Sequence, residues 1–168
     1  MAESRKNLEA AFAGESQANR KYLAYARKAE EEGFPNVAKL FRAAADAETV
    51  HALRHLRTLG MIRATAENLE DALAGESHEV EAMYPGFVAQ ARREAEKPAE
   101  LAFSGALAAE KVHRDLYAKA LEKVRAGQDI EAARYFTCSI CGFTHVGDAP
   151  PEKCPVCGAS ASKFRETE

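Results

Sequence analysis

The sequence lacks any apolar run of the roughly 20 residues needed to cross a bilayer, and its start, Met1–Lys6, has no hydrophobic signal core. It also lacks an excess of basic charge. The formal net charge is -3, with acidic and basic side chains interspersed, so no stripe suited to binding phosphates stands out. We therefore expect a cytoplasmic protein with neither a membrane nor nucleic acid as partner.

Cysteine is missing from most of the chain, because all four cysteines lie between positions 138 and 157. In a reducing compartment such a cluster predicts a metal site rather than a pair of disulfides.

The 168 residues, 46% of them hydrophobic, are enough for a packed core. Disorder is therefore not expected.

Glycine and proline are sparse up to about residue 126, and Ala, Leu, Glu, Lys and Arg dominate there. Turn signals occur at Gly33-Phe34-Pro35, Leu59-Gly60, Glu96-Lys97-Pro98 and Gly127. They divide the region into four helical segments of roughly 22 to 34 residues. The expected fold class is an all-α four-helix bundle over residues 1–130, followed by a small metal-binding domain over 131–168.

The helical region contains an internal repeat. Ala13-Gly14-Glu15-Ser16 recurs as Ala74-Gly75-Glu76-Ser77, and Ala47–His51 resembles Ala109–His113. Glu48 follows Glu15 by 33 positions, whereas Glu110 follows Glu76 by 34. The nearly equal spacings predict two helical hairpins that present equivalent side chains at equivalent heights.

The cysteines form two C-x-x-C turns separated by twelve residues, each followed by a glycine: Cys138, Cys141, Gly142 and Cys154, Cys157, Gly158. This pattern suits tetrahedral thiolate coordination of one metal ion. Spacing alone favours iron and zinc equally. With Tyr135, Phe136 and Phe164 available as a small aromatic core, the segment resembles a rubredoxin module, which implies one iron that carries single electrons.

In each predicted helix a carboxylate interrupts the apolar stripe, at Glu15, Glu48, Glu76 and Glu110. An isolated Glu is usually solvated, and a single Glu-x-x-His pair is weak evidence, but two such pairs occur, Glu48 with His51 and Glu110 with His113. Residues at i and i+3 share a helix face. Four buried carboxylates are costly unless they bind cations. The pattern matches the ligand scheme of carboxylate-bridged di-iron bundles, so the four-helix bundle is expected to be ferritin-like.

Glu79 adds a further acid one turn after Glu76. A bundle with this extra Glu, joined to a rubredoxin-like tail, resembles the rubrerythrin family across essentially the whole chain. The resemblance implies that Glu48 and Glu110 bridge two irons, that Glu15 and Glu79 bind one iron with His51 as an alternative ligand, and that Glu76 and His113 bind the other. Tyr22 and Tyr84 match tyrosines that the family places beside the ligands, although ordinary core tyrosines explain them equally well. His55, His78 and His145 have no assigned role.

By the same resemblance we expect a non-haem di-iron peroxidase of oxidative-stress defence, with Glu79, His51, Tyr22 and Tyr84 at the reacting site. Hydrogen peroxide is its substrate, and a reductase or a rubredoxin supplies electrons through the cysteine-bound iron. Two alternatives stay open: a ferroxidase that handles iron, and a zinc ribbon on a non-catalytic scaffold. The short linker near residues 127–134 suggests that a partner subunit's tail serves each di-iron site, in a head-to-tail homodimer.

One turn departs from the family's usual pattern. Ala95-Glu96-Lys97-Pro98 has no residue suited to a left-handed helix cap, unlike Gly33 in the first hairpin. We therefore expect this hinge to stay extended and to exchange helices between subunits. An antiparallel hairpin within one chain would refute that hypothesis.

Overall fold

The computed structural model describes residues 3–167, in two compact units that divide between Arg63 and Ala64. The elements are α1 (Glu3–Glu31), α2 (Pro35–Thr58), α3 (Thr65–His78), the π-helix η1 (Glu79–Met83), α4 (Tyr84–Arg93), α5 (Lys97–Arg125), β1 (Tyr135–Cys138), β2 (Thr144–Val146), the 3-10 helix η2 (Ala161–Lys163) and β3 (Phe164–Glu166). All four predicted helix breaks are confirmed. Across residues 3–167, none of the helices combines the length and apolarity that a membrane crossing needs.

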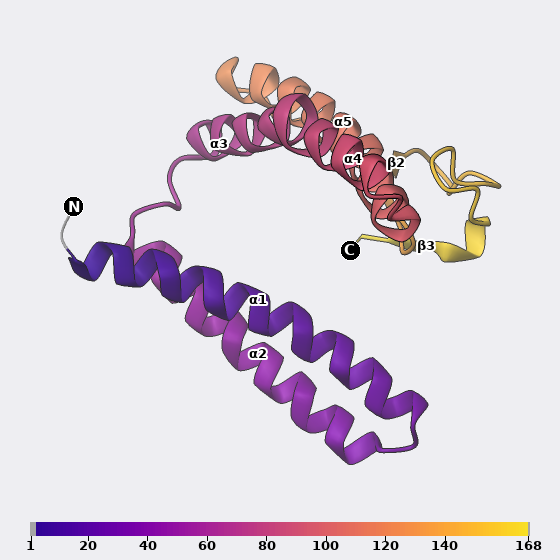
Figure 1. The fold of residues 1–168 in the computed structure, drawn as a ribbon. Helices are drawn as coiled ribbons and strands as arrows, with labels where there is room; N and C mark the ends of the chain where they lie inside the picture. Colours follow the sequence, from indigo (N-terminus) through magenta and orange to yellow (C-terminus); the bar gives the residue numbers. More distant parts are fainter. Residues whose placement is uncertain (1–2, 168) are drawn as a thin grey trace. The chain divides into compact units, whose positions relative to one another are not determined.

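The first unit is an antiparallel hairpin of α1 and α2 (Figure 1). Its turn uses Gly33 at φ 83°, and Pro35 opens α2, where a missing N–H costs nothing. Small residues let the two helices approach closely, since Ala26, Ala29 and Ala38 are buried with Phe41 packed on them. Further from this turn, two side-chain hydrogen bonds join α1 to α2.

Those bonds come from the buried Asn19 of α1. Its Nδ2 donates to the carbonyl of Ala45 at 2.7 Å and to the hydroxyl of Thr49 at 2.8 Å. A buried amide is costly without partners, so these two bonds fix the register of α1 against α2. That register determines which α1 side chains face the carboxylate of Glu48.

In the second unit α3, η1 and α4 follow one another as a single helical rod that packs against α5 (Figure 1). The π turn is marked by the Tyr84 N–H, which donates to the carbonyl of Glu79 five residues earlier. Pro85 supplies a physical reason, because proline has no N–H and its ring crowds the carbonyl four residues before it in an α-helix. A widened turn just before Pro85 relieves that conflict.

The turn between α4 and α5 corrects one prediction. The chain reverses within a few residues, so the hinge at Ala95–Pro98 is not extended and exchanges no helices. Ala95 adopts φ 56°, the left-handed conformation that Gly33 adopts in the first hairpin. The Glu96 N–H donates to the carbonyl of Ala91 at 2.9 Å. Such bonds offset the roughly 1–2 kcal/mol that a left-handed residue with a side chain costs, so an alanine serves where glycine was expected.

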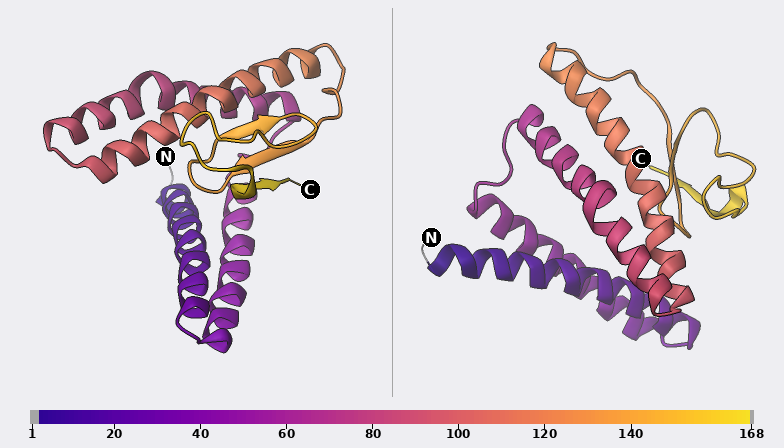
Figure 2. Two further views of the ribbon diagram at one scale, coloured as in Figure 1. Left: turned by 90° about the vertical axis from the view of Figure 1, so that its right-hand side faces the viewer. Right: turned by 45° about the horizontal axis from the view of Figure 1, so that its top comes forward.

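After α5 the chain runs through residues 126–134 into a three-stranded antiparallel sheet of order β2-β1-β3. Phe136 is buried beneath it, and Phe143 meets Phe164 edge-on at 6.5 Å between ring centroids. Arg134 closes the domain by pairing with Glu166 at 2.7 Å. Figure 2 shows this small domain running beside α5 of the same unit.

Candidate metal centres

The four cysteines converge as the spacing predicts, and their sulfurs lie within 4.8 Å of one another. The Sγ atoms of Cys138 and Cys157 are 3.7 Å apart, and those of Cys141 and Cys154 are 3.6 Å apart. Metal–sulfur bonds of about 2.3 Å in a tetrahedron place sulfurs about 3.8 Å apart. The arrangement therefore fits a single tetrahedrally coordinated ion.

Backbone N–H groups face these sulfurs, because each knuckle curls back on itself. Gly142 and Gly158 adopt φ 80° and 73° and donate to the carbonyls of Cys138 and Cys154, both at 2.9 Å. Burial opposes ionisation of Cys138, but N–H groups of Ile140 and the next residue outweigh it and lower the pKa of this thiol to about 7. At Cys138 the knuckle thus stabilises the thiolate, which is the form that binds metal, whereas burial raises the pKa of Cys141 and of Cys157.

The first unit carries a half-site of three ligands, Glu15 from α1 with Glu48 and His51 from α2, within 4.8 Å of one another. The Nδ1 atom of His51 lies 3.0 Å from a carboxylate oxygen of Glu48. Hydrogen bonds from His51 and then from Glu15 lower the pKa of Glu48. The His51 side chain is 54% exposed, whereas that of Glu48 is 18% exposed.

The second unit carries the equivalent half-site, Glu76 from α3 with Glu110 and His113 from α5, again within 4.8 Å. The Nδ1 atom of His113 lies 2.7 Å from a carboxylate oxygen of Glu110. His113 is 27% exposed, half the value of His51. The structure thus brings six of the seven predicted bundle ligands together in two groups of three, one per unit.

Glu76 is the most constrained of these carboxylates. Its Oε2 atom is buried without a hydrogen-bond partner among the described residues. Burial first, and then the neighbouring Glu110 and Glu79, raise its pKa to about 7. A buried acceptor that faces other acids is unfavourable by itself, and a cation at this position would satisfy it. The donor set of carboxylates and one imidazole suits iron.

Glu79, the seventh predicted ligand, is the first residue of the π turn. It is not one of the group of three, but the charges of that group act on it. Burial and the charge of Glu110 raise its pKa. The same influences act on Tyr84, whose pKa is raised by burial and then by Glu79 and Glu110. Both residues therefore belong to the acidic surroundings of the second half-site.

The π turn also explains the unequal spacings of the repeat. Glu76 follows Glu15 by 61 positions, whereas Tyr84 follows Tyr22 by 62. One residue is therefore extra between these two points of the second hairpin, and η1 is the widened turn that lies there. A π turn accommodates one added residue without changing the faces of the helix on either side. Glu79 lies at its first position.

The two predicted tyrosines lie in matching aromatic clusters, each on its own hairpin. The Tyr22 ring centroid is 6.2 Å from that of Phe41, and the Tyr84 centroid is 6.4 Å from that of Phe103. No described contact joins Tyr22 to the first group of ligands. His145 lies against Phe136 in the small domain, with ring centroids 6.5 Å apart.

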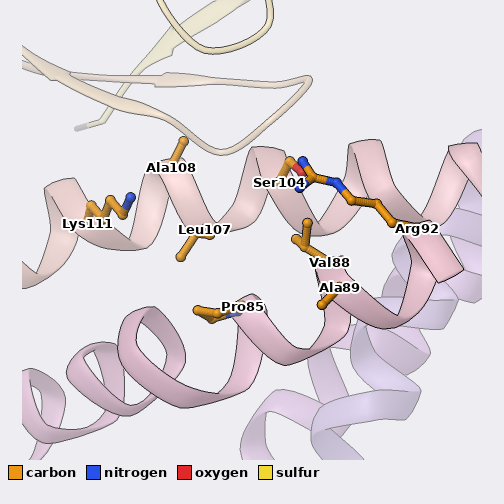
Figure 3. Close-up of a pocket in the computed structure, with 8 residues that line it drawn as sticks. All are labelled: Pro85, Val88, Ala89, Arg92, Ser104, Leu107, Ala108 and Lys111. Atoms are coloured by element: carbon orange, nitrogen blue, oxygen red, sulfur yellow. The ribbon is translucent and has the colours of Figure 1, made fainter.

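A cleft of about 460 Å³ between α4 and α5 is separate from these ligands (Figure 3). Pro85, Val88 and Ala89 line it from α4. Its two cations, Arg92 and Lys111, come from the two helices, and Arg92 is already paired with Glu100 at 2.9 Å. None of the predicted metal ligands lines this cleft.

Sequence reasoning missed Thr144, a residue of β2. Its hydroxyl oxygen lies 2.8 Å from Nε2 of His113. The two residues are 31 positions apart in different domains, so no local pattern in the sequence signals this contact.

The helices, the two carboxylate–histidine groups and the four-cysteine domain together define a ferritin-like di-iron protein with a C-terminal rubredoxin-like domain. Comparison with protein families agrees. The sequence model of the rubrerythrin family matches residues 6–121, and that of the rubrerythrin rubredoxin-like domain matches residues 136–165. The chain belongs to the rubrerythrin family, which is a family of oxidoreductases.

Relatives are similar over nearly the full length. Rubrerythrin-2 of Clostridium acetobutylicum is 36% identical over 94% of this chain and 93% of its own. Rubrerythrin of Nitratidesulfovibrio vulgaris is 33% identical over 95% and 91%. Among solved structures, nigerythrin in its fully reduced, all-ferrous state is 31% identical and covers 99% of this chain and 88% of its own, with a TM-score of 0.56. The predicted family, fold class and iron cofactors are confirmed.

Proposed function

We propose that this protein reduces hydrogen peroxide to water at a di-iron centre, with electrons delivered through the iron of the four-cysteine site. The balanced reaction is H2O2 with two electrons and two protons giving two H2O. The observation that carries the proposal is the presence in one chain of two carboxylate–histidine groups and a one-electron carrier site. A centre that is oxidised in each turnover has to be re-reduced, and a carrier of single electrons in the same protein can supply the electrons.

We assign the seven bundle ligands as the family resemblance implies. In that assignment Glu48 and Glu110 would bridge the two metals, and the remaining ligands would divide between them: Glu15, Glu79 and His51 on one, Glu76 and His113 on the other. When bound, the reduced di-iron pair supplies the two electrons that cleave the O–O bond. The carboxylates would hold the metal pair and neutralise its charge, and Oε2 of Glu76 would gain a partner that residues 3–167 do not give it.

We assign Tyr84 to act on the substrate. Burial, and then Glu79 and Glu110, raise its pKa further above its ordinary value, so the hydroxyl is protonated at neutral pH. A protonated Oη can donate a hydrogen bond to a peroxide oxygen and orient it. As the family resemblance implies, Glu79 would be a ligand that can be exchanged for His51 when the charge of the site changes.

The test is a rapid-mixing comparison on fully iron-loaded, reduced protein. Hydrogen peroxide is expected to oxidise the di-iron centre faster than dioxygen does, and the ferric four-cysteine colour is expected to appear afterwards as electrons leave that site. Faster oxidation by dioxygen would contradict the proposal. Consumption of added ferrous iron beyond the capacity of the sites would indicate iron handling instead.

A further inference from the structure

The His113 imidazole is held from both sides. Its Nδ1 atom faces Glu110 on the same helix at 2.7 Å, and its Nε2 atom faces the Thr144 hydroxyl at 2.8 Å. Thr144 belongs to the sheet that carries the cysteine knuckles, so one ring joins the ligand group of α5 to the small domain. Of the bundle ligands in residues 3–167, His113 alone has a described hydrogen bond to that domain.

A threonine hydroxyl suits this position because it can either donate or accept a hydrogen bond. Without metal, a ring that donates from Nδ1 to Glu110 leaves Nε2 as an acceptor, and the hydroxyl donates to it. If a metal bound Nδ1, the ring proton would be on Nε2, and the hydroxyl would accept it. The same hydroxyl can therefore hold the ring in one orientation with either tautomer, because only its hydrogen has to rotate.

Thr144 is itself tied closely to the cysteine knuckle. It pairs with Thr137 in the antiparallel register of β1 and β2, and the neighbouring Phe143 carbonyl accepts the Cys138 N–H at 2.9 Å. A rigid support of this kind is what an orienting residue needs. Displacement of the knuckle would move the Thr144 hydroxyl with it.

The knuckle is seated on α5 by small residues. A Cβ added at Gly105 would lie 3.5 Å from the Cβ of Cys141, and one added at Gly142 would lie 4.0 Å from the Cβ of Ala109. Ala109 is only 2% exposed. These close approaches lie one to two turns before His113 on the same helix, so the seating of the knuckle determines where Thr144 reaches α5.

We propose that Thr144 is a positioning residue for His113, through which the rubredoxin-like domain of the same chain orients a ligand of the di-iron centre. The inference rests on the proposed assignment of His113 as a metal ligand. Beyond the proposed function, this one hydrogen bond links the docking of the rubredoxin-like domain to the geometry of the metal site.

The experiment compares Thr144→Val, which keeps the shape but removes the hydroxyl, with Thr144→Ser, which keeps the hydroxyl. Ferrous iron is titrated anaerobically by calorimetry into full-length protein whose four-cysteine site already holds iron. Residues that orient a metal-bound histidine are typically worth about 10- to 100-fold in metal affinity. We expect Thr144→Val to weaken one ferrous site by that factor and Thr144→Ser to bind within about threefold of the parent.

Thr137→Val is the matched control, because Thr137 lies opposite Thr144 in the sheet and the described hydrogen bonds include none from its hydroxyl. It is expected to bind ferrous iron as the parent does. The visible spectrum of the ferric four-cysteine site is expected to be the same in all variants, which shows that the small domain is folded.

His113→Ala separates the role of Thr144 from the assignment of His113 as a metal ligand. Loss of affinity in His113→Ala but not in Thr144→Val would overturn the role of Thr144 and leave the metal assignment intact. No loss in His113→Ala would overturn the assignment itself. Equal weakening in Thr144→Val and Thr144→Ser would also refute the inference, because affinity would then depend on the packing of this side chain and not on its hydroxyl.

Discussion

The two helical hairpins carry the same ligand pattern but hold it differently. In the first, His51 is more than half exposed and Glu48 is its described partner among residues 3–167. In the second, His113 is half as exposed and lies between Glu110 and Thr144. The second also has the π turn with its extra acid. The two halves of the repeat thus differ in support: His51 is held on one side and His113 on both.

This difference suits a centre in which one ligand changes place. In the proposed scheme, a histidine held on one side would leave or join a metal at lower cost than one held on both sides, and Glu79 at the start of the π turn would serve the same metal. The ligands of the second hairpin would stay in place meanwhile. The predictions below test whether the hairpins differ in this way.

The largest expected effect comes from the histidines themselves. His113→Ala should lower ferrous affinity at its site by more than about 100-fold, because even residues that only orient a ligand contribute about 10- to 100-fold. His51→Ala should cost less, since the proposed scheme lets Glu79 serve the same metal. Calorimetric titration of both variants measures the difference, and equal losses would remove the asymmetry between the hairpins.

The second prediction removes the π turn. Deletion of Glu81, whose side chain is 71% exposed, takes out the extra residue and leaves Pro85 within an uninterrupted helix, at a cost of about 3 kcal/mol. Combining the deletion with Pro85→Ala should recover most of that stability. Chemical denaturation of both proteins measures it.

The same pair of variants tests what the π turn is for. If it positions Glu79, the stable double variant should still lose ferrous affinity relative to the parent with Pro85→Ala alone. A double variant with full affinity would show that the extra residue serves only the fold.

A third prediction concerns pH and the metal-free protein. The folded-state pKa of Glu76 is about 7, above its ordinary 4.5, so between these values the folded state binds more protons than the unfolded state. Stability should therefore be highest below about pH 4.5 as far as this group is concerned and should fall as pH rises to 7. Allowing for solvent screening, we expect a loss of about 1–2 kcal/mol.

Glu76→Gln is the matched variant for this measurement, because an amide of the same shape does not titrate. Its denaturation free energy should vary less between pH 4.5 and 7 than that of the parent. Parallel slopes in the two proteins would contradict the assigned burial of Glu76.

The smallest expected effect compares the two hairpin turns. Ala95→Gly should stabilise the protein by roughly 0.5–1 kcal/mol, because glycine adopts the positive φ without the cost that alanine has. Gly33→Ala should destabilise it by a similar amount. Thermal midpoints of the two variants should therefore move in opposite directions.

Much of the architecture could be predicted from local signals. Gly33, Gly60 and Gly127 mark helix ends because their conformation favours glycine, and the cysteine spacing is specific enough to predict a tetrahedral site. Ala95 could not be predicted in the same way, because its left-handed conformation is imposed by backbone hydrogen bonds that have no signal in composition.

The residue types of the candidate site and the helix faces that carry them could be predicted, but the contacts that hold these side chains in place could not. The excess residue between Glu76 and Glu110 was visible in the sequence, yet its placement as a π turn before Pro85 depends on backbone strain. The bond between Thr144 and His113 depends on how two domains pack. Periodicity within one helix contains no information about that.

The linker of residues 126–134 has a consequence for how strong the docking of the small domain needs to be. A short tether converts docking into an intramolecular event, with an effective concentration on the order of millimolar. At that concentration a contact as modest as a few small residues and one hydrogen bond can hold the domain against α5 without the area that an interface between separate molecules needs.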